Sequence, residues 1–322
     1  MALIKVKLFG KFSARRDEQS LAGLDVFRAQ ELFTYLLVHR DRPHTREALA
    51  TLLWGETPTE KAKKYLRQTL WHLQTALDSP DSGPERTLLL AEHDWVQLNL
   101  SAELRLDVAD FEEAHAQARG ISGRELGPEQ FAAMQRAAAL YTGDLLEGWY
   151  QDWCLFERER LQNIYLTLLD KLLGYCVARQ NYEAGQFYGG LLLQQDRAHE
   201  RTHRQLMRLH YRAGDRTAAL RQHERCRAAL SEELGVEPDR RTAALCEQIR
   251  ADRLAAPAPF DAAPRGADEA AEPECLGKSL PDVLAQLLQL QSVLAETQRR
   301  VRREIKSVEL SLRQKTQRIF DR

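Results

Sequence analysis

The sequence predicts a mainly α-helical protein in which strands are confined to the N-terminal third. Three observations carry this prediction. Alternating apolar and polar residues, the pattern of a half-buried strand, occur near the N-terminus and again around residues 87–100. Residues 106–250 are almost continuously amphipathic at helical spacing. Residues 280–319 keep apolar residues at heptad spacing, which is typical of a coiled coil.

The composition is that of an ordinary globular protein. The chain has 322 residues, of which 43% are hydrophobic and 29% charged, so there is room for two domains. It shows no apolar run of membrane-spanning length and no signal peptide, so we expect a cytoplasmic protein with no membrane partner. The five cysteines form no Cys-x-x-Cys pair, which favours buried thiols over disulfides or a zinc site. A net charge of −1 excludes a globally basic coat for nucleic acid but leaves room for a local basic face.

The first hundred residues predict a small sheet, three helices and a hairpin, in that order. The expected strands are residues 4–8, 11–14 and 24–27, and the expected helices are 29–39, 46–53 and 61–77, the last two capped by Thr45 and Thr59. Strand-like runs at 87–91 and 95–100 flank Glu92-His93-Asp94 and predict a hairpin with a charged tip. A helix-turn-helix followed by a hairpin is a winged helix, and its third helix enters the major groove of DNA.

The helix expected at residues 61–77 has a basic outer face and contains no carboxylate. Leu66, Leu70, Leu73 and Leu77, with Ala62 and Thr69, form its apolar stripe. The side chains expected to contact DNA are Lys61, Lys63, Lys64, Arg67, Gln68, Trp71, His72 and Thr75. The lysines would mainly hold phosphates, while Arg67, Gln68 and His72 are the best candidates for base edges.

Two parts of this interface have alternative interpretations. The helix alone would also fit an ordinary surface helix with solvated lysines, so the assignment depends on the surrounding winged helix. For Trp71, packing against the hairpin or a neighbouring subunit is favoured over a contact with DNA. The acidic hairpin tip is a poor contact for phosphate, so we expect it to contribute less to DNA binding than the helix does.

The second region predicts a stack of amphipathic helices. They are expected at residues 107–118, 128–141, 153–179, 182–194, 201–213, 217–234 and 240–249, the first capped by Asp107. Asn181-Tyr182-Glu183-Ala184 recurs as Asp215-Arg216-Thr217-Ala218, 34 positions later, and Ala184 and Ala218 are expected at equivalent close helix contacts. This is the period of a tetratricopeptide repeat, in which stacked helix pairs form a concave binding surface.

Several motifs in order carry a resemblance to a known family. They are Leu8-Phe9-Gly10, the helix Gln30–Leu37, Arg46-Glu47-Ala48-Leu49, Leu53-Trp54, Lys64-Tyr65-Leu66-Arg67, Val96-Gln97-Leu98, Tyr141-Thr142-Gly143-Asp144-Leu145-Leu146, Arg158 with Leu161, Leu206 to Asp215, and Glu233 to Pro238. Over residues 2–250 the chain resembles the SARP family (Streptomyces antibiotic regulatory protein-like activators), which joins an OmpR-type winged helix to a bacterial transcriptional activator domain. One departure is Asp196-Arg197, where the family usually has proline after the aspartate.

The resemblance implies a transcriptional activator that binds repeated promoter sites in double-stranded DNA and recruits RNA polymerase. The boundaries that we expect are 1–104 for the winged helix, 105–252 for the helical activator domain, 253–279 for a disordered linker and 280–322 for a coiled-coil helix. The linker is rich in Ala, Pro, Asp and Glu and cannot bury a core.

The C-terminal heptads predict self-association into a homo-oligomer. The apolar a and d positions are Leu280, Leu284, Leu287, Leu294, Val301, Ile305, Val308, Leu312 and Ile319. Gln291 and Gln298 occupy d positions and would lower stability while fixing register. The alternative is a helix that packs back on the protein.

Two stretches resemble catalytic motifs, but neither predicts an enzyme. His199-Glu200-Arg201-Thr202-His203 matches H-E-x-x-H, yet it lacks a third ligand and falls at an expected turn. Gly277-Lys278-Ser279 lacks the first glycine of a P-loop. We therefore expect no catalytic site, metal or cofactor. Two other hypotheses stay open: an adaptor that binds peptides rather than DNA, and a metallopeptidase that would need zinc at His199 and His203.

Overall fold

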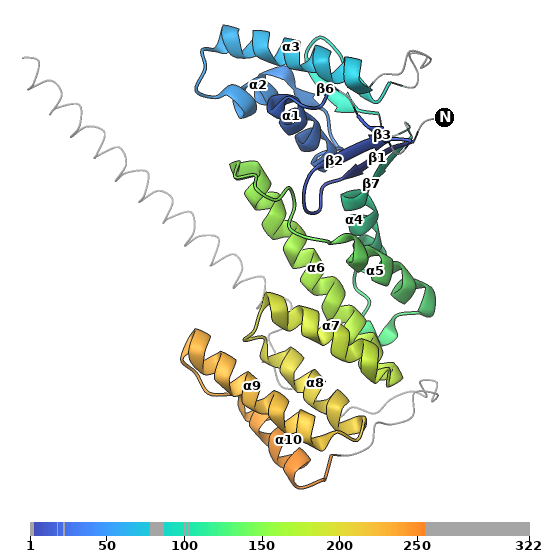
Figure 1. The fold of residues 1–322 in the computed structure, drawn as a ribbon, viewed down its shortest axis with the longest axis vertical. Helices are drawn as coiled ribbons and strands as arrows, with labels where there is room; N and C mark the ends of the chain where they lie inside the picture. Colours follow the sequence, from blue (N-terminus) through green and yellow to red (C-terminus); the bar gives the residue numbers. More distant parts are fainter. Residues whose placement is uncertain are drawn as a thin grey trace, which may run out of the picture. The chain divides into compact units, whose positions relative to one another are not determined.

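The computed structural model describes residues 3–17, 19–21, 23–77, 87–99, 101 and 103–254. In this part of the chain the protein is mainly helical, with strands only in the N-terminal portion (Figure 1), as predicted. None of the described helices is long and apolar enough to cross a membrane. The predicted coiled coil and its nine apolar heptad positions lie outside the described residues, as does the predicted linker from residue 255 onwards.

A four-stranded sheet opens the fold. Its strands are β1 (Ile4–Lys7), β2 (Ser13–Arg16), β3 (Gln19–Ser20) and β7 (Leu104–Leu106), in the order β3-β2-β1-β7. β1 pairs antiparallel with β2 and parallel with β7, so both ends of the N-terminal domain meet in one sheet. The alternation of Ile4 and Val6 with lysines places both apolar side chains in the core, as the sequence predicted.

Three helices and a second sheet complete a winged helix. The helices are α1 (Phe27–Val38), α2 (Arg46–Trp54) and α3 (Thr59–Leu77). The second sheet contains β4 (His44–Thr45), β5 (Leu89–Ala91) and β6 (Trp95–Leu98), in the order β4-β6-β5. β5 and β6 form the predicted hairpin, and Thr45 caps α2 by accepting a hydrogen bond from the Ala48 N–H at 3.2 Å.

Four details of this domain differ from the predictions. The strand expected at residues 24–27 is wrong, because Leu24 is buried as a core residue and α1 already begins at Phe27. The strand expected at 11–14 lies later, at Ser13–Arg16. Strands β3, β4 and β7 were not predicted, since two or three residues are too few to show a period. Thr59 lies inside α3, where the Pro58 carbonyl accepts the first helical hydrogen bonds from the N–H groups of Lys61 and Ala62.

The remaining described chain is helical. It contains α4 (Asp107–Gln117), a short 3₁₀ turn η2 (Gly123–Glu125), α5 (Pro128–Leu140), α6 (Asp152–Arg179), α7 (Tyr182–Gln195), α8 (Glu200–Arg212), α9 (Arg216–Leu234) and α10 (Arg240–Arg250). These bounds agree with the predicted helices to within one or two residues. α6, α7, α8 and α9 pack each against the next in chain order (Figure 1).

The internal repeat has a physical basis in the caps of α7 and α9. The Asn181 carboxamide accepts a hydrogen bond from the Ala184 N–H at 3.3 Å, and the Asp215 carboxylate accepts one from Ala218 at 2.8 Å. The close helix contacts, however, lie one residue beyond the predicted alanines. Gly185 and Ala219 are buried, and a Cβ on Gly185 would lie 2.6 Å from Leu209 Cδ1. The expectation for Ala184 and Ala218 is therefore wrong by one position.

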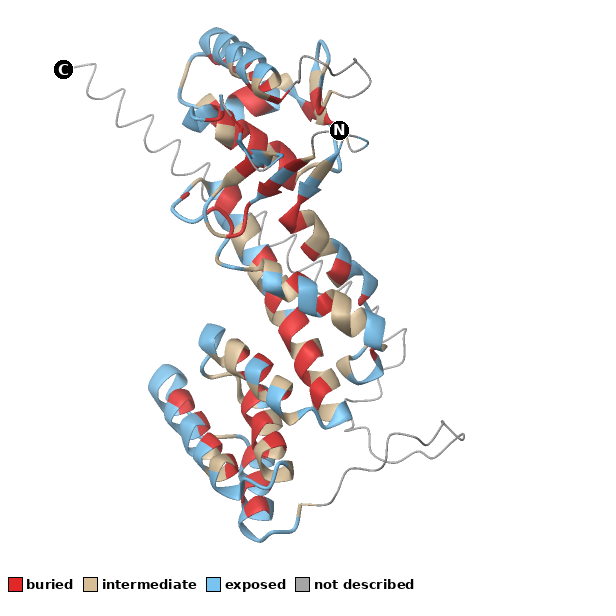
Figure 2. Ribbon diagram, turned by 45° about the vertical axis from the view of Figure 1, so that its right-hand side comes forward, coloured by how far each residue is buried: buried red, intermediate tan, exposed pale blue. Residues whose placement is uncertain are grey.

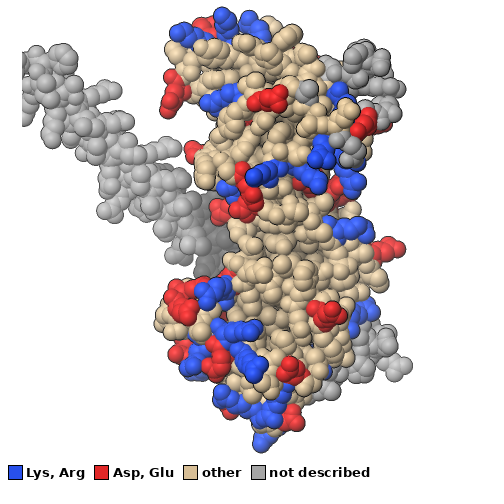
Figure 3. Space-filling view, in the orientation of Figure 1, with Lys and Arg blue, Asp and Glu red and all other residues tan. Residues whose placement is uncertain are grey.

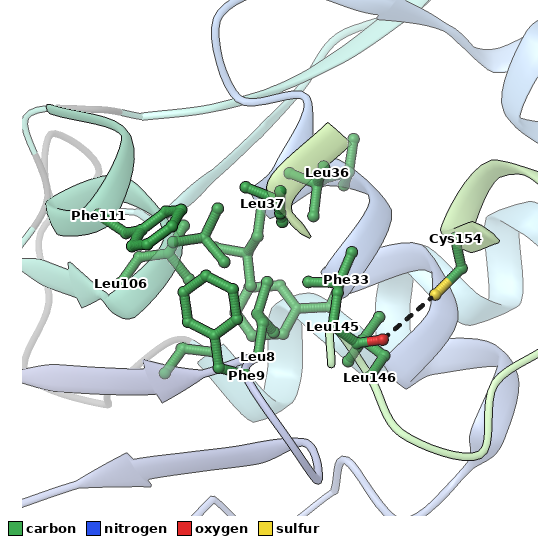
Figure 4. Packing of buried hydrophobic residues seen from close by; sticks show 14 of the residues in the cluster. Leu8, Phe9, Phe33, Leu36, Leu37, Leu106, Phe111, Leu145, Leu146 and Cys154 are labelled. Atoms are coloured by element: carbon green, nitrogen blue, oxygen red, sulfur yellow. Dashed lines mark hydrogen bonds between the residues drawn. The ribbon is translucent and has the colours of Figure 1, made fainter. Parts of the chain in front are cut away.

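The winged helix and the helical domain share one hydrophobic core. The segment after β1 pairs with residues 144–147: Gly10 donates to the Asp144 carbonyl, Leu146 to that of Leu8, and Glu147 to that of Gly10, each at 2.8 Å. We call these two segments, residues 8–10 and 144–147, the joint. In Figure 4 the side chains of both segments meet between Phe33 of α1, Phe111 of α4 and Cys154 of α6.

One buried and one half-buried polar side chain hold the joint in place. The Asp107 carboxylate accepts hydrogen bonds from the N–H groups of Leu8, Phe9 and Val108, so it ties the end of β1 to the first turn of α4. Burial raises the pKa of the Asp107 carboxyl, and these N–H groups oppose that shift. From α6, the Arg158 guanidinium donates to the carbonyls of Leu145, Leu146 and Trp149 at 2.9 to 3.1 Å. The prediction that Asp107 caps α4 is wrong, because Leu106 is the N-cap residue and Asp107 is the first residue inside the helix.

Candidate nucleic-acid interface

Helix α3 is held by one apolar stripe and exposes the opposite side. Its buried residues are Ala62, Leu66, Leu70, Leu73 and Leu77, which is the predicted stripe except that Thr69 is only half-buried. All eight predicted DNA-contacting side chains, Lys61, Lys63, Lys64, Arg67, Gln68, Trp71, His72 and Thr75, are exposed. Figure 2 shows this outer side of α3 as a continuous exposed surface.

The positive charge on α3 is largely uncompensated. Within the described residues no carboxylate lies at ion-pair distance from Lys61, Lys64 or Arg67. Lys63 differs, because its Nζ lies 3.6 Å from a carboxylate oxygen of Glu60 in the first turn. Lys and Arg side chains accordingly gather along α3 at the upper edge of the molecule in Figure 3. Such a face attracts a polyanion, because the described part of the chain offers its cations few acidic partners.

Trp71 and Thr75, further along α3, differ in how well they could contact DNA. Trp71 is 61% exposed, and its ring contacts that of His72 with centroids 4.9 Å apart. Most of its surface is therefore open to solvent, and whether it contacts DNA or a neighbouring subunit stays a prediction. The Thr75 hydroxyl donates to the Trp71 carbonyl at 2.9 Å. In this rotamer Thr75 offers only an acceptor, which does not suit a phosphate oxygen.

The hairpin tip is fixed beside the start of α2 by a residue that the sequence did not single out. The Arg46 N–H donates to the Asp94 carbonyl at 3.0 Å, and its Nε donates to the Glu92 carbonyl at 2.9 Å. Arg46 therefore places a guanidinium at an otherwise acidic tip. No sequence signal could have revealed this, because the contact depends on β4 pairing with β6.

The H-E-x-x-H stretch begins α8 rather than lying on a turn, and its histidines are engaged within the protein. His203 is buried; one ring nitrogen lies 2.9 Å from the Arg197 carbonyl and the other accepts from Gln222 Nε2 at 2.8 Å. His199 Nδ1 lies 2.7 Å from the Thr202 hydroxyl. The Glu200 carboxylate accepts hydrogen bonds from the Thr242 hydroxyl and from the Asp239 N–H. These contacts give the motif a structural role, and within the described chain no group of three or more metal-ligating side chains gathers.

The burial of His203 predicts a pH dependence of stability. Burial lowers the pKa of His203 below its ordinary value of 6.5, and it lowers the pKa of His210 in the same way. As the pH falls through 6.5 the unfolded chain binds a proton before the folded chain does, so stability is full above that pH and is lost below it. We expect a lower melting temperature at pH 5.5 than at pH 7.5, and a smaller difference in His203→Asn.

The matched control for this prediction is His93→Asn, because the His93 side chain is 98% exposed. Its difference between the two pH values should equal that of the wild type. A difference in His203→Asn as large as in the wild type would contradict the assignment.

Comparison with known proteins finds a family that matches the helical region and a relative that matches most of the chain. Residues 106–250 match the family described as bacterial transcriptional activator domain. Regulatory protein AfsR of Streptomyces coelicolor is 28% identical over 237 residues, which is 73% of this chain and 23% of that protein. The chain thus spans about a quarter of the length of this curated relative.

A solved structure of EmbR from Mycobacterium tuberculosis, in complex with a low affinity phosphopeptide, has a similar fold. The match has a TM-score of 0.60 at 19% identity and covers 80% of this chain and 67% of that one. At that identity the likeness concerns the fold alone. The chain thus joins a winged helix with an exposed basic helix to a bacterial transcriptional activator domain. The family match and the relative together support a transcriptional regulator of the SARP family.

Proposed function

We propose that the chain is a sequence-specific DNA-binding activator whose helix α3 enters the major groove. The observation that carries this proposal is the exposed face of α3, on which Lys61, Lys64 and Arg67 have no carboxylate partner within the described chain. Lys61, Lys63 and Lys64 would neutralise phosphates, and Arg67, Gln68 and His72 would address base edges. Arg46 would supply a cation where the hairpin tip approaches the backbone of the duplex.

The resemblance to the SARP family supports the further steps. Binding to repeated promoter sites and recruitment of RNA polymerase are what the SARP resemblance implies, and the helical domain is the candidate surface for activation. Self-association through residues 280–322 would add affinity, because a second site is then bound at a high effective concentration. The adaptor hypothesis does not explain why α3 exposes unpaired positive charge, so we favour the DNA-binding function.

The test is genome-wide immunoprecipitation of the tagged chain from its native host. We expect discrete promoter peaks for the wild type and their disappearance in Lys64→Ala/Arg67→Ala. The matched control is Arg221→Ala/Arg240→Ala, which removes two exposed arginines from α9 and α10 and should keep every peak. Absence of peaks in cells that express the wild-type chain would reject the proposal in favour of the adaptor.

A further inference from the structure

The helical domain contains a cavity that the proposed DNA-binding function does not use. It has a volume of about 570 Å³ and lies between α7, α8 and α9. The face of α8 that lines it presents His203, Leu206 and His210, which are spaced to lie on one side of the helix. A volume of this size is typical of a site for a small molecule.

Small residues keep this cavity open. Gly190 of α7 and Ala228 and Ala229 of α9 all line it. A Cβ on Gly190 would meet no atom within 4 Å, whereas a Cβ on the preceding Gly189 would lie 2.6 Å from Leu206 Cδ2. Gly189 is therefore needed for helix packing. Gly190 is not, and its lack of a side chain only enlarges the cavity.

Two glutamine–histidine pairs fix the polar part of the wall. Gln222 of α9 donates to His203 at 2.8 Å, and Gln186 of α7 lies 3.4 Å from His210 Nδ1. Burial lowers the pKa of both histidines, so both rings are neutral near pH 7. The histidines thus brace α8 against its two neighbours and contribute no charge to the cavity.

The charge of the cavity comes from two arginines. Arg197 is already paired, with carboxylate oxygens of Glu232 and Glu233 at 3.1 and 3.6 Å. Arg225 lines the cavity and, within the described residues, has no carboxylate at ion-pair distance. None of the side chains that line the cavity is an aspartate or glutamate. Arg225, whose side chain is exposed, is therefore the unpaired cation among lining residues that include the apolar Leu193, Leu206 and Ala229.

We propose that this cavity binds a small carboxylic acid with an apolar body, of the medium-chain acyl class. Its carboxylate pairs with Arg225, and its chain lies on Leu193 and Leu206. An arginine binds a carboxylate through two parallel hydrogen bonds, which a neutral alcohol cannot reproduce. Because α7, α8 and α9 all contribute to the wall, the bound acid stabilises their packing. This proposal does not rest on DNA binding by α3.

The test is calorimetric titration of the intact chain with octanoate, beside 1-octanol and octylamine as neutral and cationic probes of the same length. We expect one octanoate per chain and binding of the other two probes weaker by at least about tenfold. Arg225→Gln should weaken octanoate binding about tenfold without affecting 1-octanol. Gly190→Leu and, independently, Ala228→Leu should abolish binding by filling the cavity.

The matched control is Glu183→Leu, which places the same side chain at an exposed position of α7 outside the cavity. It should bind octanoate as the wild type does, and circular dichroism establishes that each variant is folded. Failure of the wild type to bind octanoate at millimolar concentration would overturn the proposal. Equal affinity for 1-octanol, unchanged binding in both folded cavity variants, or binding of an acidic peptide in place of octanoate would overturn it as well.

Discussion

Replacing Lys64 and Arg67 together by alanine is expected to lower the affinity of the chain for its DNA sites on the order of 100-fold at 0.15 M salt. Neither side chain has a carboxylate partner in the described chain, so the substitutions should leave the stability of the free protein almost unchanged. The expected loss is therefore a loss of interactions in the complex with DNA. Two positive contacts disappear, and the slope of log affinity against log salt should become shallower by about 2. Fluorescence anisotropy with a duplex taken from an immunoprecipitation peak measures both quantities.

Gln68→Ala separates the reading of bases from the neutralisation of phosphates. Gln68 is exposed on the same face of α3 but carries no charge. Its loss should weaken binding to the specific duplex while leaving non-specific duplexes and the salt slope unchanged, whereas Lys64→Ala should weaken binding to every duplex. If both variants lose affinity equally for all duplexes, Gln68 does not contact a base.

Replacing Arg158 by methionine is expected to destabilise the folded chain by about 3 kcal/mol. Methionine keeps much of the length and apolar stem of the side chain but removes the donors to three backbone carbonyls, those of Leu145, Leu146 and Trp149. These carbonyls belong to the joint and to the segment that follows it, and of the three only that of Leu146 also accepts a backbone hydrogen bond among the described residues, from the Trp149 N–H at 3.0 Å. Urea unfolding followed by circular dichroism gives the free energy of unfolding.

Arg158→Lys should restore little of this loss, because a single ammonium group cannot reproduce the planar fork of the guanidinium. The matched control is Arg201→Met, which removes an arginine that is 63% exposed and lies 3.3 Å from Asp170. It should cost less than about 1 kcal/mol. Equal losses for Arg158→Met and Arg201→Met would show that Arg158 does not hold the joint.

The sequence predicted the helices well because each has a long apolar stripe. The stripe of α3 is an example, since five leucine and alanine positions repeat over five turns and leave no alternative face to bury. The prediction failed at residues 24–27, where the alternation of Leu24 and Val26 resembles a strand, but Val26 is exposed and α1 already begins at Phe27. The sequence could not predict β4 or β7, because each is defined by its partner strand and not by its own residues.

The same distinction applies to the candidate site. The basic face of α3 could be predicted from the sequence, because all the residues that form it lie on one helix. The role of Arg46 was not, since its partners lie 46 and 48 positions later on the hairpin. The motifs Leu8-Phe9-Gly10 and Tyr141 to Leu146 were both noted in the sequence as separate features. Their pairing across more than 130 residues is a property of the fold alone.

If α3 binds DNA as proposed, the pairing of these two segments sets the orientation of the helical domain on the duplex. Residues 8–10 and 144–147 are joined by three backbone hydrogen bonds and pack in one core, so the start of the helical domain is held against the winged helix. A copy docked by α3 therefore carries its helical domain at a fixed angle around the double helix. On tandem sites separated by whole turns of about 10.5 base pairs, all helical domains point to the same side of the DNA, and an added half turn sends alternate copies to the opposite side.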